Sequence, residues 1–197
     1  MGSELSDVSK LLSEWGSVKR EGQPLLEELC NTVLMRTYVD AYDREATWGR
    51  LAGDGMHRCI GLKVEAKIAA LHRTLTALHQ EMHQLIVEVQ SIADALEAAL
   101  CSSGLTEAAH GNEVQVIAVR GGYELRDAAR VVRAAAVMLE KELELTGAVL
   151  QDSILCSDRN TLTLYTAAWM MQPFMDQQVL KDLTAMAPST SEVTALP

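Results

Sequence analysis

Hydrophobic residues recur every three or four positions through most of the chain, and this spacing predicts α-helices. The pattern is longest at about residues 61–100 and 123–152, where apolar residues alternate steps of four and three in a heptad pattern. The core-facing positions of the first stretch, its seam, are Val64, Ile68, Leu71, Leu75, Leu78, Met82, Leu85, Val89, Ile92, Leu96 and Ala99. The seam of the second stretch is Leu125, Ala129, Val132, Ala136, Leu139, Leu143, Thr146 and Leu150. Because the two seams have the same period, we expect each long helix to pack antiparallel against a second one. The partner is either the other long helix of this chain or a helix of another chain.

Shorter segments with the same spacing flank the two long helices. The pattern predicts helices at about 6–20 and 24–37, separated by a break at "EGQP". Two more are predicted at about 160–171, after cap candidates at Ser157 and Asp158, and at about 179–186, beyond a stop at Pro173. Residues 38–55 have no such regularity and are expected to form a loop. The stretch "EVQVIAVRGG" is expected to be an extended arm, because an isolated strand would have nothing to pair with.

These patterns predict an all-α fold: an elongated antiparallel coiled coil or helical bundle with two long heptad helices and short flanking helices. Residues 6–186 are expected to form a single helical domain. Residues 1–5 and the polar stretch 187–197 are expected to be disordered.

The composition of the chain argues against several classes of function. The net charge of −10 argues against a nucleic-acid-binding surface, which needs clustered Lys and Arg. The chain has no run of eighteen apolar residues, so no membrane span is predicted. Four cysteines are spread without a C-x-x-C motif, so they are expected to be buried or unreactive thiols in a reducing compartment.

Three of the eight aromatic residues gather in "TLTLYTAAWMMQPFMD". Tyr165 and Trp169 are four apart on one helix face, and Phe174 follows the Pro173 break, beside the adaptable Met170. The ring cluster either closes the end of the coiled coil as core or forms a partner-facing patch. We expect a divided result in which Tyr165 is mainly structural, Phe174 mainly partner-facing and Trp169 both.

Three histidines form a candidate metal site. His72, His79 and His83 fall on about one helical face, and a pair four apart can chelate a metal. Gln80 stands where the zinc-protease pattern needs a glutamate, and no carboxylate or cysteine cluster completes the site. A surface beside the seam is therefore the favoured interpretation, and a metal-binding bundle is the alternative.

Arg126, Arg130 and Arg133 align on one face of the second long helix. Such a row can clamp a phosphate or an acidic partner, although Asp127 reduces its positive field. No nucleotide-binding loop or catalytic motif accompanies it, so neither an enzyme nor a cofactor is predicted.

Four blocks of sequence resemble the cyclin-dependent kinase 2-interacting protein family. These blocks are "LLSEWGSVKREG", the central heptads, "YELRDAARVVRAAAVMLEKELEL" and "LTLYTAAWMMQPF", in the family's order and approximate spacing. Together they cover about residues 8–186, and the last block is the most specific.

The resemblance implies a nuclear, non-enzymatic adaptor. It would link cell-cycle kinases that fire replication origins, origin-bound replication proteins and ATR checkpoint signalling. The resemblance also implies a subunit of an AAA+ ATPase complex that acts in ribosome maturation and replisome turnover. The expected partner is helical and forms a heteromeric complex, with no direct nucleic-acid or membrane contact; a generic coiled-coil tether is the alternative.

The sequence constrains how kinases would bind. No proline follows a serine or threonine, so there is no proline-directed phosphorylation site. An Arg-x-Leu docking candidate occurs at Arg73-Thr74-Leu75, but Leu75 is a seam position. Kinases would therefore contact a folded surface of this protein.

Overall fold

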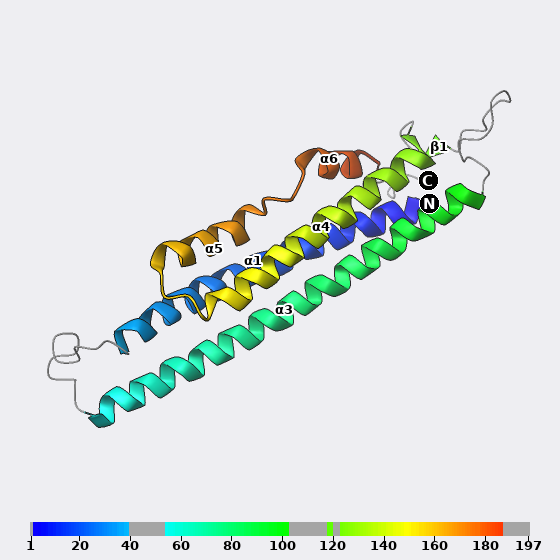
Figure 1. The fold of residues 1–197 in the computed structure, drawn as a ribbon. Coiled ribbons are helices and arrows are strands. Elements are labelled where there is room, and N and C mark those ends of the chain that lie inside the picture. Colours follow the sequence, from blue (N-terminus) through cyan, green and yellow to red (C-terminus); the bar gives the residue numbers. More distant parts are fainter. Residues whose placement is uncertain (1, 40–53, 103–117, 120–122, 187–197) are drawn as a thin grey trace, which may run out of the picture. The chain divides into compact units, whose positions relative to one another are not determined.

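The computed structural model describes residues 2–39, 54–102, 118–119 and 123–186, and it shows the predicted all-α fold (Figure 1). The helices are α1 (Gly2–Val39), α3 (Asp54–Ser102), α4 (Leu125–Ser153), α5 (Arg159–Met171) and α6 (Gln177–Met186). The two longest helices are α1, with 38 residues, and α3, with 49. They pack antiparallel, and ion pairs join Glu28 to Lys67 and Arg36 to Glu65.

Helix α1 runs through Pro24 without a break, so the prediction of two helices separated at "EGQP" is wrong. A proline inside a helix loses one backbone hydrogen bond and costs about 3 kcal/mol. Burial compensates, because buried positions keep their helical spacing across the proline. These positions are Trp15, Val18, Gly22, Leu26, Leu29 and Val33.

The amino-terminal end of α1 also differs from the prediction. Residues 2–5 were expected to be disordered, but α1 begins at Gly2 and the side chain of Leu5 is buried. The apolar spacing of Leu5, Val8 and Leu11 is that of the helix that follows, which explains why the helix extends so far.

Helices α3 and α4 contact each other as an antiparallel pair, as their seams predict. Gln90 donates a hydrogen bond to Glu140, and Arg133 reaches back to Asp94 and Glu97. The predicted core positions are buried except for Ile92 and Leu143, which are partly buried, and Ala99, which is exposed.

Helix α4 buries a second stripe that the heptad pattern did not predict. Its members are Ala128, Val131, Ala135, Met138, Glu142, Val149 and Ser153. Helix α4 is therefore covered on two sides, whereas a two-helix coiled coil buries one.

A small β-pairing precedes α4. Strand β1 (Ala118–Val119) pairs antiparallel with β2 (Tyr123–Glu124), in the register Val119 to Tyr123. The extended arm therefore does find a partner, which is the chain immediately before α4. Residues 40–53 of the expected loop and the expected disordered tail 187–197 lie outside the described residues.

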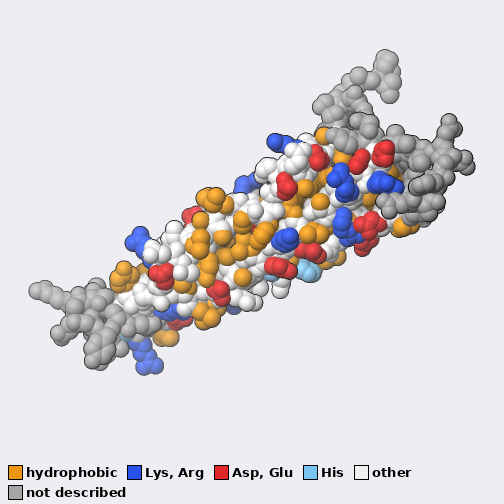
Figure 2. Space-filling model, turned by 45° about the horizontal axis from the view of Figure 1, so that its top comes forward, with side chains coloured by type: hydrophobic (Ala, Val, Ile, Leu, Met, Phe, Trp, Pro, Cys, Tyr) orange, Lys and Arg blue, Asp and Glu red, His pale blue; other side chains and the backbone are white. Residues whose placement is uncertain are grey.

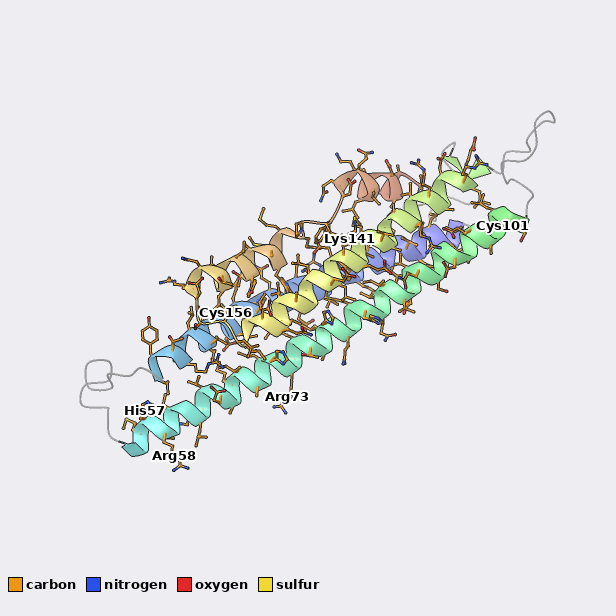
Figure 3. The ribbon with its side chains drawn as sticks, viewed as in Figure 1. His57, Arg58, Arg73, Cys101, Lys141 and Cys156 are labelled. Atoms are coloured by element: carbon orange, nitrogen blue, oxygen red, sulfur yellow. The ribbon has the colours of Figure 1, made fainter. Side chains whose placement is uncertain are left out.

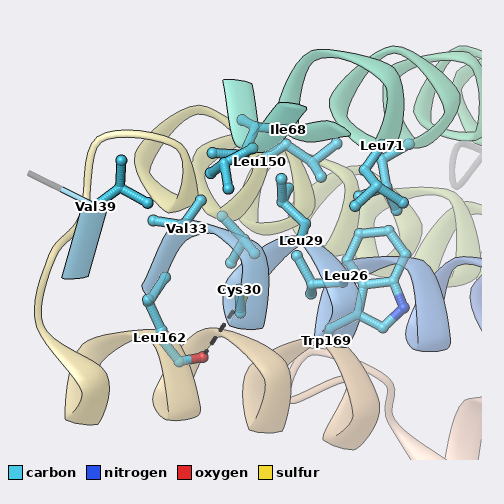
Figure 4. Packing of buried hydrophobic residues seen from close by; sticks show 13 residues of the cluster. Leu26, Leu29, Cys30, Val33, Val39, Ile68, Leu71, Leu150, Leu162 and Trp169 are labelled. Atoms are coloured by element: carbon cyan, nitrogen blue, oxygen red, sulfur yellow. Dashed lines mark hydrogen bonds between the residues drawn. The ribbon is translucent and has the colours of Figure 1, made fainter. Parts of the chain in front are cut away.

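The chain divides into two compact units, each drawing on α1, α3 and α4. Unit 1 comprises Met1–Gly16, His83–Lys141 and Phe174–Pro197, and unit 2 comprises Ser17–Met82 and Glu142–Pro173. In unit 2, side chains of α1, α3, α4 and α5 form one buried cluster around Leu29, Leu75 and Trp169 (Figure 4). In unit 1, α6 buries Leu183 and Met186. None of the described helices is long and apolar enough to cross a membrane.

Candidate protein-interaction site on helix α5

The ends of α5 are fixed by local hydrogen bonds. Asp158 caps the amino-terminal end, where its carboxylate accepts hydrogen bonds from the hydroxyl and the backbone N–H of Thr161, at 2.7 Å and 2.8 Å. These hydrogen bonds hold the pKa of Asp158 below its usual value. At the other end Gln172 adopts a left-handed conformation with φ of 47°, directly before Pro173. The predicted cap and stop are both confirmed.

The inner face of α5 is anchored by Trp169. This side chain is 2% exposed, and its indole nitrogen donates a hydrogen bond to the carbonyl oxygen of Lys19 in α1 at 3.0 Å. The ring lies against Gly22, where an added Cβ would stand 2.4 Å from a ring carbon. Only glycine fits at this position, so α1 and α5 approach each other closely.

A buried polar group lies beneath the indole ring. The ammonium of Lys19 is 4.2 Å from the ring centroid of Trp169 and donates to the hydroxyl of Thr146 in α4 at 3.5 Å. Burial lowers the pKa of Lys19 to about 8, and the negative charge of the buried Glu142 acts in the opposite direction. We call Lys19, Glu142, Thr146 and Trp169 the polar layer; it joins α1, α4 and α5 within unit 2.

The other two aromatic residues of the predicted cluster are Tyr165 and Phe174. Tyr165 is partly buried, and its hydroxyl donates to Asp152 at 3.4 Å. Burial, followed by the charge of Asp152, raises the pKa of Tyr165. Phe174 belongs to unit 1 and is half exposed, so the structure does not place the three rings in one cluster of one unit.

The outer face of α5 is apolar and exposed. Leu164 and Met171 are 65% and 74% exposed, and Ala167 lies between them at helical spacing. Met170 is also exposed, and the side-chain amide of Gln23 donates to its sulfur at 3.6 Å. Figure 2, turned so that this side comes forward, shows hydrophobic side chains gathered on the surface. We call Leu164, Ala167 and Met171 the outer stripe.

The outer stripe was missed by sequence reasoning, which followed the aromatic rings. A signal was present, because no charged residue occurs between Arg159 and Asp176. A helix that is apolar on both sides is usually covered on both sides. The cores of protein interfaces are likewise depleted of charged residues.

The predicted arginine row is largely engaged within unit 1. Arg133 donates to Glu97 at 2.8 Å and pairs with Asp94, and the hydrogen bond lowers the pKa of Glu97. Arg130 pairs with Asp127 at 3.3 Å, and Arg126 is exposed. Arg133 thus holds α4 to α3, and a role for the row in partner binding stays a prediction.

The histidines are not brought together as metal ligands. The Nε2 atom of His79 lies 3.2 Å from the carbonyl oxygen of Leu143, so this imidazole links α3 to α4. His72 lines a groove on α3, and His83 belongs to unit 1. Across the part of the chain that the structure describes, no group of three His, Cys, Asp or Glu residues could hold a metal ion.

The cysteines differ in exposure. Cys30 is buried, and burial raises its pKa to about 11, while Cys59 and Cys101 are exposed. Burial is therefore confirmed for Cys30, while the expectation that Cys59 and Cys101 are unreactive stays a prediction.

The fold and the outer stripe define a helical-bundle protein with a candidate protein-binding face. No protein-family model and no curated protein matches this chain. The function of this chain is therefore inferred from the surface of α5 and from the sequence resemblance.

Proposed function

We propose that this chain is a non-enzymatic adaptor subunit and that the outer stripe of α5 binds a partner protein. The observation that carries the proposal is a helix that is anchored on one face and apolar on the other, with no charged residue between Arg159 and Asp176. Methionine and leucine side chains adapt to the surface they meet, which suits a protein interface.

The sequence resemblance supports the choice of partners. We propose a nuclear adaptor that links cell-cycle kinases, origin-bound replication proteins and ATR checkpoint signalling. In the same proposal the chain is a subunit of an AAA+ ATPase complex in ribosome maturation and replisome turnover. Such a role needs no cofactor, and it needs a surface that a helical partner can cover.

The test is affinity purification from nuclear extract with the full chain as bait, quantified by mass spectrometry. Leu164→Asp places a charge in the outer stripe, and Thr163→Asp places the same charge on the same helix at an exposed position outside it. Both changes lie on exposed positions, so both variants should keep the melting temperature of the wild type.

We expect recovery of AAA+ ATPase subunits with the wild type and with Thr163→Asp, and at least about a tenfold loss with Leu164→Asp. The proposed partners are wrong if neither kinases nor AAA+ subunits are recovered with the wild type. The proposed surface is wrong if both variants recover them equally.

A further inference from the structure

Helix α3 is basic in its first half and acidic in its second. Between residues 54 and 74 it carries four cations, Arg58, Lys63, Lys67 and Arg73, against two carboxylates, Asp54 and Glu65. From residue 75 to residue 102 it carries Glu81, Glu88, Asp94 and Glu97 and no Lys or Arg. A local excess of cations is unusual in a chain whose net charge is −10.

A groove of about 590 Å³ lies on this basic half, within unit 2. Ala66, Ile68 and Ala69 of α3 form one wall, and Ile154 and Leu155, directly after α4, form the other. Leu155 is 79% exposed, which leaves a large apolar side chain uncovered at the edge of the groove. The lining is therefore mainly apolar.

Two arginine side chains, Arg36 and Arg73, lie at the rim of the groove. Arg36 donates to the carbonyl oxygen of Ile154 at 2.6 Å and lies 3.9 Å from Glu65, so its charge is partly compensated. Arg73 donates to the carbonyl of Ala69 within its own helix, and it forms no ion pair with the described residues. Figure 3 shows Arg58 and Arg73 extending away from α3.

The shape of the groove suits a helix. Its wall follows α3, where Leu62, Ala66, Ala69 and Arg73 recur at helical spacing on the exposed side. Leu62 is 66% exposed, and the two alanines are small enough to let a second helix approach closely. An occupant would thus meet small side chains along α3, Leu155 on the opposite wall and Arg73 at one end.

We propose that this groove binds an amphipathic helix of a partner protein whose apolar face is flanked by carboxylates. The apolar side chains of that helix would cover Ala66, Ala69 and Leu155, and its carboxylates would pair with Arg73. The groove is a second binding surface, distinct from the outer stripe of α5. This proposal depends on the proposed adaptor function in one respect, because it takes the molecule bound in the groove to be a protein.

The test uses two synthetic helical peptides of about five turns, with the same leucine and alanine stripe. Glutamates flank the stripe in one peptide, and lysines flank it in the other. Dissociation constants are measured with the full chain by fluorescence anisotropy. The variants are Arg73→Glu at the rim, Ala69→Trp on the wall, and Arg58→Glu as a matched charge change on the same helix outside the groove.

We expect the glutamate peptide to bind the wild type at least about tenfold more tightly than the lysine peptide. Arg73→Glu should weaken the glutamate peptide about tenfold and should strengthen the lysine peptide. Ala69→Trp should abolish binding, whereas Arg58→Glu should change the dissociation constant by less than about threefold. Leu164→Asp should leave peptide binding unchanged, which separates this groove from the proposed function of α5.

Several outcomes would overturn the proposal. It is wrong if the two peptides bind equally, or if Ala69→Trp leaves binding intact. It is also wrong if a duplex RNA binds more tightly than the glutamate peptide in an Arg73-dependent way. Dimerisation of the chain that Ala69→Trp abolishes would show that a second copy covers the groove. Circular dichroism of every variant excludes loss of the fold as the cause.

Discussion

Lys19 is a charged residue at a position where a helix normally buries an apolar one. It is nearly inaccessible, and so is Glu142 on α4. Removing two charges from water is unfavourable, and their attraction repays this only in good geometry. The polar layer is therefore better suited to fixing the alignment of α1, α4 and α5 than to adding stability.

The first prediction concerns that pair. Glu142→Leu should lower the free energy of unfolding by about 3 to 5 kcal/mol at pH 7, because Lys19 stays buried without its neighbouring anion. Lys19→Met combined with Glu142→Leu should recover most of that loss. Denaturant unfolding measures both variants. Lys10→Met, at an exposed position paired with Glu14 at 3.6 Å, is the control and should change stability by less than about 1 kcal/mol.

The second prediction concerns pH. The pKa of Lys19 falls from 10.5 to about 8 on folding. Between these values the unfolded chain binds more protons than the folded chain, so the free energy of unfolding should rise with pH. The rise should reach about 3 kcal/mol by pH 10.5, relative to Lys19→Met at each pH. A difference that stays constant from pH 7 to pH 10.5 would contradict the lowered pKa.

The third prediction concerns Gly22. In an ordinary helix interior, glycine to alanine adds about 1 kcal/mol of stability. Gly22→Ala should instead destabilise by about 1 to 3 kcal/mol, because the new Cβ overlaps the ring of Trp169. Trp169→Phe removes part of that ring, so the double variant should lose less than the sum of the single variants. Additive losses in thermal unfolding would show that the two residues are not in contact.

At the scale of elements, Pro24 raises the question of what holds α1 together. The proline deprives the carbonyl oxygen of Arg20 of its helical partner, while buried residues continue on both sides. Packing against other helices therefore maintains α1, and backbone hydrogen bonding contributes less at this point.

The fourth prediction follows from this balance. Pro24→Ala restores one hydrogen bond and should raise the free energy of unfolding by about 2 kcal/mol, after the entropy gained by the unfolded chain is subtracted. Glu21→Ala, at an exposed position of the same helix, should stay within about 0.5 kcal/mol of the wild type. Urea unfolding of both variants measures the effect. A loss of stability in Pro24→Ala would mean that α1 requires the bend that a proline introduces.

Much of the fold follows from local patterns. The seams of α3 and α4, the Asp158 cap and the Pro173 stop could all be read from spacing and turn residues. The continuity of α1 through Pro24 could not be predicted in this way, because the local preference of proline competes with burial against distant segments. The second stripe of α4 was visible as Ala128, Val131, Ala135 and Met138, but heptad matching selects one stripe and ignores a second.

The candidate site was less predictable. Trp169 was identified from its ring, but burial against α1 depends on Gly22, far away in sequence. The burial of Lys19 likewise has no local signal, since a lysine beside an apolar stripe usually extends its charge into water. Contacts between distant segments therefore decide which aromatic and charged residues are accessible.

At the scale of the whole molecule, α6 contributes buried side chains to unit 1 alone. Leu183 and Met186 are almost fully buried, and the backbone N–H of Asp176 lies 2.9 Å from the sulfur of Met138. Burial of two such side chains stabilises by about 3 to 6 kcal/mol.

The fifth prediction tests whether α6 stabilises unit 1. A chain ending at Pro173 lacks α6 but keeps every residue of unit 2. Amide hydrogen exchange should accelerate in residues 83–102 and 125–141, which belong to the same compact unit as α6. Residues 54–82 should keep their protection. A uniform loss of protection over α3 would show that the truncation affects the whole chain and not unit 1 in particular.

The composition of the two units also limits how such a protein can change over generations. Unit 1 draws on three separate stretches of the chain, and unit 2 on two. Neither unit corresponds to one continuous piece of a gene, so recombination cannot transfer either of them intact into another protein. Duplication of a gene fragment would copy only part of a core. New binding properties in descendants of this chain should therefore arise by point substitution on exposed faces, while the helices that cross both units are inherited together.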